Sequence, residues 1–168
     1  ALGLAYQLGF GVRKDDAEAL AWLRKSAAQD FVRAYAPLAG MYEEGLGVPQ
    51  DTAQAVALYL KGAERGDAYA QARLGSAYLL GRNGVRQDLP EALRWLRKAA
   101  EQGDPTGEYY LGFAYYPGLG VHADAREAFA WCLKAAGHGD VVSAATVGSM
   151  YDGGRGVAED ASKAVEWY

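Results

Sequence analysis

Hydrophobic positions in the chain repeat at the spacing of a helix. Ala70, Leu74 and Tyr78 lie four residues apart, which places them along one helical face. A second apolar stripe with helical spacing, rich in alanine and containing a tryptophan, runs from residue 92 to residue 100. Gly81 and the glycine-rich stretch after it separate the two stripes. The pattern predicts two antiparallel helices, the first ending near Gly81 and the second beginning near Asp88.

The same helix pair recurs along the whole chain. A tyrosine marks each copy at intervals of 36, 36, 37 and 36 residues: Tyr6, Tyr42, Tyr78, Tyr115 and Tyr151. A large apolar residue stands four before each tyrosine, and a Gly-Val turn and an aspartate follow it; the longer interval comes from one extra residue between Gly81 and Gly84. Such a period predicts an all-α solenoid of about five helix pairs, forming one domain over residues 1–168. The expected repeats span about residues 1–30 (partial), 31–66, 67–103, 104–139 and 140–168 (partial).

The aspartate of each repeat is expected to cap the second helix. Four copies read Asp-x-x-Glu or Asp-x-x-Gln, as in Asp88 and Glu91, so the aspartate is expected to accept from a backbone N–H while the N3 side chain reaches back. Each cap contributes about 1 kcal/mol. Between repeats, Gly66, Gly103 and Gly139 each precede an aspartate, whereas Asp30 stands where the first such glycine is expected. An irregular turn is therefore predicted at Asp30.

Composition removes several function classes. A net charge of −4 without a cluster of lysine or arginine argues against nucleic acid or an anionic membrane as a partner, and no apolar run is long enough for membrane insertion. Cys132, the single cysteine, excludes an internal disulfide and is expected to be a small core residue. His122 and His138 fall in predicted turns, so no catalytic residue, metal site or cofactor is expected. The repeated aspartates are explained as caps, and the Gly-x-Gly stretches between helices as turns rather than nucleotide loops.

The repeat Leu-Gly-x-x-Tyr-x-x-Gly-x-Gly-Val-x-x-Asp, followed by Ala-x-x-Trp and Lys-Ala-Ala, resembles the Sel-1-like repeat (SLR) family, a branch of the tetratricopeptide-like helical repeats. The resemblance covers almost the whole chain and implies a right-handed α/α superhelix whose first helices, the A helices, line the concave side. It also implies a scaffold or adaptor in protein complexes, and favours a bacterial periplasmic or secreted location over the cytoplasm. A cysteine-rich bacterial branch with reported penicillin-binding or β-lactamase activity differs from this chain, because Cys132 has no partner cysteine.

Candidate binding residues are those on the expected concave face that vary between repeats. In the fourth repeat Tyr110, Phe113 and Tyr116 are spaced three apart on one helix face and are interpreted as aromatic anchors for a partner, although packing against a neighbouring repeat would explain them too. Three further residues would extend this surface toward the N-terminus, one as an apolar contact and two as orienting charges: Leu79, Arg73 and Glu43.

The sequence thus predicts a non-enzymatic scaffold that binds a protein or peptide segment on the concave face of the A helices. Two alternatives stay open: a bacterial envelope protein that binds or hydrolyses a glycan or β-lactam-like ligand, and a structural spacer within a longer protein. Because both ends of the chain fall inside a repeat, self-association through the incomplete terminal repeats is also expected.

Overall fold

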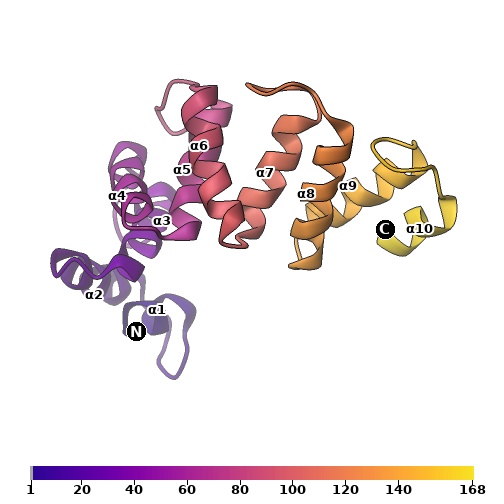
Figure 1. Ribbon diagram of the computed structural model, residues 1–168. Coiled ribbons are helices and arrows are strands. Elements are labelled where there is room, and N and C mark those ends of the chain that lie inside the picture. Colours follow the sequence, from indigo (N-terminus) through magenta and orange to yellow (C-terminus); the bar gives the residue numbers. More distant parts are fainter. Residues whose placement is uncertain (1) are drawn as a thin grey trace.

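The structure, a computed structural model that describes residues 2–168, consists of antiparallel helix pairs (Figure 1). The first helices of the pairs, here called A helices, are α1 (Leu2–Leu8), α3 (Tyr35–Glu44), α5 (Ala68–Leu80), α7 (Pro105–Tyr115) and α9 (Val141–Asp152). The second, or B, helices are α2 (Asp16–Ala28), α4 (Thr52–Glu64), α6 (Leu89–Glu101), α8 (Ala125–Gly137) and α10 (Ala161–Trp167). One short 3₁₀ turn, η1 (Val32–Ala34), precedes α3, and the described residues contain no strand.

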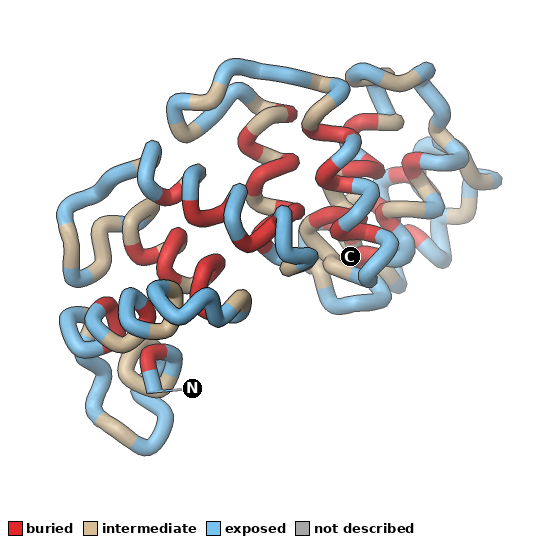
Figure 2. Tube along the Cα trace, turned by 60° about the vertical axis from the view of Figure 1, so that its left-hand side comes forward, coloured by how far each residue is buried: buried red, intermediate tan, exposed pale blue. Residues whose placement is uncertain are grey.

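Each helix packs mainly on its neighbours in the chain, so the pairs form a curved array with the two ends of the chain far apart (Figure 1). Buried residues follow the interior between the helices, and exposed residues lie mostly on the connecting turns and outer faces (Figure 2). The all-α solenoid of five helix pairs predicted from the repeat is confirmed.

Capping of the B helices is confirmed for the aspartate but not for the glutamate. The Asp88 carboxylate accepts from the Glu91 backbone N–H at 3.0 Å, and the equivalent aspartate caps every other B helix. The predicted reciprocal bond, from the Asp88 N–H to the Glu91 side chain, does not form. The Asp88 N–H donates to the carbonyl oxygen of Tyr78 at 3.0 Å instead. The marker tyrosine of each of the other repeats accepts in the same way. The Glu91 side chain is thereby left to accept from Arg94 and Trp95.

The turn at Asp30 is irregular, as the sequence predicts. Asp30 takes a left-handed φ of 58°, and the short η1 turn follows instead of a capped helix start. The Asp30 carboxylate accepts from the Tyr35 hydroxyl and pairs with Arg65 at 2.8 Å. These bonds stabilise a backbone conformation that glycine adopts at the other inter-repeat turns.

Glycine lets the two helices of a unit approach closely. A Cβ added at Gly112 in α7 would lie 2.6 Å from the Cys132 sulfur in α8, and one at Gly75 would lie 2.7 Å from Leu96 Cγ. Cys132 is 3% exposed, so the prediction that it is a core residue is confirmed.

The extra residue of the third repeat changes how its loop packs. In the second and fourth repeats the loop glycines Gly47 and Gly120 rest on the first residue of the B helix one repeat earlier. A Cβ at Gly84, the corresponding glycine of the third repeat, would meet nothing within 4 Å. At this position the third repeat thus lacks the close approach to the preceding B helix, and Asn83 in the same loop takes a left-handed conformation with φ of 57°.

Candidate functional site

The surface formed by the A helices is packed unevenly. Helices α5 and α7 lie directly against each other, whereas no comparable contact joins α7 and α9. The fourth and fifth repeats are connected mainly through α8 and α9 instead. A space therefore opens between α7 and α9 on the A-helix surface.

This space, here called the α7–α9 groove, contains two adjoining cavities of about 380 Å³ and about 90 Å³. Phe113 and Tyr116 form one wall and are 40% and 44% exposed. The other wall is mostly apolar or small, and its members are Val142, Ala145, Thr146, Ser149 and Met150. A concave surface with aromatic side chains on one side and short side chains on the other is suited to receive an apolar side chain.

The sequence prediction misses one aromatic residue of this groove. Tyr109 packs edge-on against Tyr110 at a centroid distance of 5.0 Å and lies 6.5 Å from Phe113. The interval of three residues from Tyr110 to Phe113 to Tyr116 omits Tyr109, which stands four before Phe113 and so shares its helix face. Arg155, also missed, donates to the Tyr116 hydroxyl at 2.7 Å from the loop that follows α9.

The predicted row of three aromatics is divided between two sites. Phe113 and Tyr116 face α9, but Tyr110 lies on the other flank of α7 and lines a separate cavity against α5. An interval of three residues turns the side chain by about 60° on a 3.6-residue helix, so two such steps carry it from one flank to the other.

The prediction for Leu79 is wrong. Leu79 is 0% exposed and belongs to a core cluster with Leu93, Leu96 and Leu111, so it offers no surface contact. Tyr116 occupies the same repeat position, one residue after the marker tyrosine, and is exposed. The difference follows from the packing of the A helices, because α7 covers Leu79 while α9 leaves Tyr116 uncovered.

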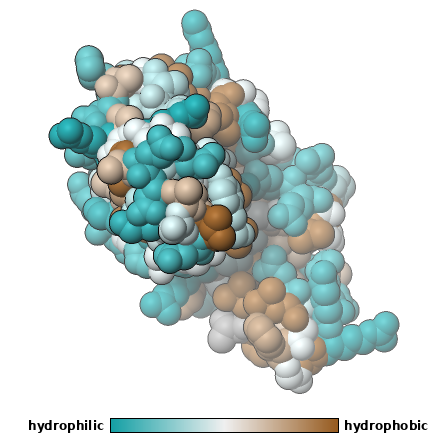
Figure 3. Space-filling view, turned by 90° about the vertical axis from the view of Figure 1, so that its right-hand side faces the viewer, coloured by the Kyte–Doolittle hydropathy of each residue, from teal (hydrophilic) through white to brown (hydrophobic). Residues whose placement is uncertain are grey.

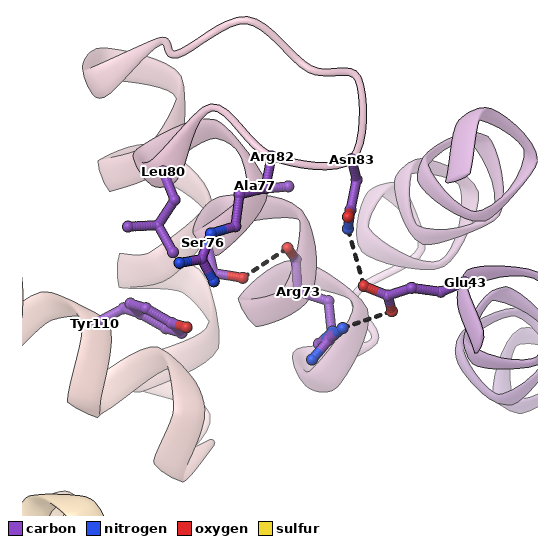
Figure 4. A pocket seen from close by; sticks show the side chains of 8 residues that line it. All are labelled: Glu43, Arg73, Ser76, Ala77, Leu80, Arg82, Asn83 and Tyr110. Carbon is purple, nitrogen blue, oxygen red and sulfur yellow. Dashed lines mark hydrogen bonds and ion pairs between the residues drawn. The ribbon is translucent and has the colours of Figure 1, made fainter. Parts of the chain in front are cut away.

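Glu43 and Arg73 lie together, but they bind each other rather than facing solvent as separate charges. The Glu43 carboxylate accepts from Arg73, from the Tyr59 hydroxyl at 2.9 Å and from the Asn83 side chain at 2.8 Å. Figure 4 shows Arg73 and Asn83 converging on Glu43 from α5 and from the loop with the extra residue. This Glu43 cluster, formed by Glu43, Tyr59, Arg73 and Asn83, ties the second repeat to the third.

The Glu43 cluster perturbs the pKa values of its acidic groups, Glu43 and Tyr59. Burial would raise the pKa of the Glu43 carboxyl, but the hydrogen bonds from Arg73 and Tyr59 and the charge of Arg73 outweigh burial and hold that pKa below its usual value. Burial raises the pKa of the Tyr59 hydroxyl well above its ordinary range. Glu43 is therefore ionised and Tyr59 is a hydrogen-bond donor at neutral pH.

A second polar pair joins the helices within the fourth repeat. Glu108 in α7 is 2% exposed, and its carboxylate contacts His138 Nδ1 at 2.8 Å, at the end of α8. The third repeat has Gln71 and Gln102 at the same two positions, hydrogen-bonded at 2.8 Å. His138 thus has a structural partner in the buried Glu108.

The described residues show little sign of reactive chemistry. Burial raises the pKa of the Cys132 thiol to about 11, so the thiolate that a nucleophile requires is scarce at neutral pH. No group of three or more His, Cys, Asp or Glu side chains that could hold a metal occurs within residues 2–168. Over the same range, no helix combines the length and the apolar character needed to cross a membrane.

Apolar side chains are also exposed outside the α7–α9 groove. Val165 and Tyr168, in and just after α10, are 74% and 72% exposed. Viewed from the C-terminal end, the surface shows hydrophobic patches separated by hydrophilic side chains (Figure 3).

The paired helices, the period of about 36 residues and the groove on the A-helix surface define a helical-repeat protein of the solenoid class. Within that class the family is established: the Sel1 repeat model matches residues 1–31, 32–67, 68–104, 105–140 and 143–168, so the chain belongs to the Sel1 repeat family. Proteins of this family are commonly scaffolds for protein–protein interaction and are typically not enzymes.

Solved structures agree with this assignment. The chain is 42% identical to a protective antigen of uropathogenic Escherichia coli that has an SLR fold, with a TM-score of 0.85 over 99% of this chain and 36% of that chain. A Sel1 repeat protein from Oxalobacter formigenes is 35% identical, with a TM-score of 0.89 over 99% of this chain and 68% of that one. Cysteine rich protein B of Helicobacter pylori is 26% identical, with a TM-score of 0.54 over 70% of this chain and 84% of that one. The chain thus spans about a third of the length of the E. coli antigen. A search of the curated proteins gave no match.

Proposed function

We propose that this chain is a non-enzymatic scaffold that holds a segment of a partner protein on the concave face of its A helices, with an apolar side chain of that segment in the α7–α9 groove. The observation that carries the proposal is the exposure of Phe113 and Tyr116 beside cavities between two A helices that do not pack on each other. The interaction role common in the Sel1 repeat family supports it.

The groove has the composition of a binding hot spot. Rigid aromatic side chains bury a large area with little loss of entropy, and truncating such a residue at the centre of an interface costs about 2 kcal/mol or more. The hydrogen bond from Arg155 and the packing of Tyr109 hold Tyr116 and Phe113 in place before a partner binds. Pre-ordering of this kind lowers the entropic cost of association.

Selection of random displayed peptides on the immobilised protein tests the proposal. Peptides that bind the unchanged protein should lose about tenfold or more in affinity for the F113A/Y116A double variant. Phe10→Ala is the matched control, because Phe10 is 71% exposed in the loop after α1, outside the groove. Undiminished binding to the double variant, measured by fluorescence polarisation, would show that the groove is not the binding surface. Adding Tyr110→Ala to the double variant then shows whether the other flank of α7 also contributes to peptide binding.

The alternative ligands predicted from the sequence gain no support. The similar H. pylori protein is described as cysteine-rich, whereas this chain has a single, buried cysteine. Turnover of a chromogenic β-lactam, or binding to peptidoglycan fragments, would restore that alternative.

A further inference from the structure

A second cavity lies on the other flank of α7 and has a different chemistry. Its volume is about 150 Å³, well above the ~10–15 Å³ that one water needs. Polar side chains from α3, α5, α7 and the loop with the extra residue surround it, among them Glu43, Arg73, Ser76, Arg82 and Tyr110 (Figure 4). It is therefore a polar site that adjoins the proposed apolar one through α7.

Positive charge in this cavity exceeds negative charge. The one carboxylate, that of Glu43, already accepts hydrogen bonds from three donors, one of which is Arg73. Arg82 takes part in none of the ion pairs found among residues 2–168. Figure 4 shows its guanidinium reaching down toward Ser76 and Tyr110. The cavity thus holds a guanidinium with unused donors beside an arginine that Glu43 fixes in place.

We propose that this cavity binds a carboxylate of the partner segment, with Arg82 as the principal donor and Tyr110 beside it. The proposal rests on the proposed function, and it specifies the partner as a segment that carries an acidic group as well as an apolar one. A planar guanidinium and a carboxylate form paired, charge-assisted hydrogen bonds, which are the strongest that side chains make. The carboxylate can come from an aspartate or glutamate side chain or from a C-terminus.

The fold sets the spacing between the two groups of the partner. The polar cavity lies between α5 and α7, and the apolar groove lies between α7 and α9. Neighbouring helix axes are about 8–10 Å apart, and an extended chain advances about 3.3 Å per residue. The acidic residue is therefore placed about three residues from the apolar one.

Because the whole chain has a net charge of −4, recognition of the carboxylate depends on short-range contacts. Long-range attraction of an acidic segment is weak for such a protein, and added salt screens interactions beyond about 8 Å at physiological ionic strength. Selectivity for the carboxylate must come from direct hydrogen bonds in the cavity.

Short synthetic peptides test the proposal by ¹H–¹⁵N NMR titration at millimolar concentrations. Acetyl-Trp-Ala-Ala-Glu-amide carries the side-chain carboxylate, acetyl-Trp-Ala-Ala-Gln-amide is its neutral isostere, and acetyl-Trp-Ala-Ala-Ala with a free C-terminus carries the terminal carboxylate. The unchanged protein should bind at least one acidic peptide about fivefold or more tightly than the neutral one. Whichever acidic peptide shows the preference identifies the source of the carboxylate.

Three variants make the test specific. Arg82→Gln should abolish the preference, whereas Arg86→Gln should retain it, because Arg86 is exposed in the same loop but does not line the cavity. Phe113→Ala should lower the affinity of all three peptides to the same extent. Three results would overturn the carboxylate site. They are equal binding of acidic and neutral peptides to the unchanged protein, a loss of the acidic preference in Arg86→Gln equal to that in Arg82→Gln, and the absence of chemical-shift changes with any peptide. If the peptides bind without preference and Phe113→Ala still weakens them, the carboxylate site fails while the proposed function stands.

Discussion

Replacing His138 by alanine should destabilise the fourth repeat, because it removes the partner of a buried carboxylate. Glu108 is 2% exposed, so without His138 its side chain loses a hydrogen-bond partner and has to recruit water. A hydrogen bond to a charged group contributes about 1.5–3 kcal/mol. His138 is 49% exposed, so water can replace part of that bond, and we expect a loss of about 1–2 kcal/mol.

The third repeat shows which pair of residues can replace Glu108 and His138. Gln71 and Gln102 form a neutral hydrogen bond at the same two positions, so the double variant E108Q/H138Q should recover most of the stability lost in Glu108→Ala or His138→Ala. His122→Ala is the control, since His122 is exposed in a loop, and its effect should stay within about 0.5 kcal/mol.

Urea unfolding at pH 7.5, followed by circular dichroism, measures these differences. Thermal unfolding should show the His138→Ala loss as a decrease of about 2–8 °C in a chain of this size. The reasoning is refuted if His138→Ala is as mild as His122→Ala, or if the glutamine pair is no more stable than His138→Ala alone.

Four further predictions concern the described core and surface. Because Arg73 helps hold the pKa of Glu43 low, the stability that Glu43 contributes is present above the unfolded-state pKa near 4.5 and is lost as the pH falls through the lower folded-state pKa. Glu43→Gln should therefore flatten a urea-stability profile on its acid side, below about pH 4.5. Gly112→Ala should cost about 1–3 kcal/mol, since its Cβ would meet the Cys132 sulfur at 2.6 Å, whereas Gly137→Ala, with nothing within 4 Å, should be neutral or stabilising by up to about 1 kcal/mol; chemical denaturation of both variants compares them. The Cys132 thiol should react with Ellman's reagent only slowly until denaturant is added, and fast labelling of the native protein would contradict its burial. Exposed apolar side chains in α10 should promote self-association, so light scattering that shows a strict monomer at high concentration would count against that expectation.

The backbone frame follows from the sequence because its signals are local. The aspartate caps and the irregular turn at Asp30 depend on residues within a few positions of each other, and both are confirmed. The glutamate half of the cap is wrong because the competing acceptor, the Tyr78 carbonyl, comes from the preceding helix. A local pattern does not include a partner ten residues away.

The site was less predictable because it depends on how far neighbouring A helices stand apart. Leu79 and Tyr116 occupy the same repeat position, yet one is in the core and the other is exposed. A repeat alignment treats the two alike, and only the packing between repeats separates them. The extra residue near Asn83 was visible as a longer interval, but its bond to Glu43 spans 40 residues and could not be inferred from spacing.

The uneven packing of the A helices also gives the array uneven mechanical stiffness. Repeats of a solenoid touch only their neighbours, so each junction bends according to its own contacts. The Glu43 cluster braces the junction between the second and third repeats, and α5 and α7 brace the next. The junction between the fourth and fifth repeats is held mainly along α8 and α9, with one hydrogen bond from Arg155 to Tyr116 beside them, so the array should flex there about the α8–α9 line. A segment bound between α7 and α9 would fill the space at this junction, and its binding would fix the angle between the fourth and fifth repeats.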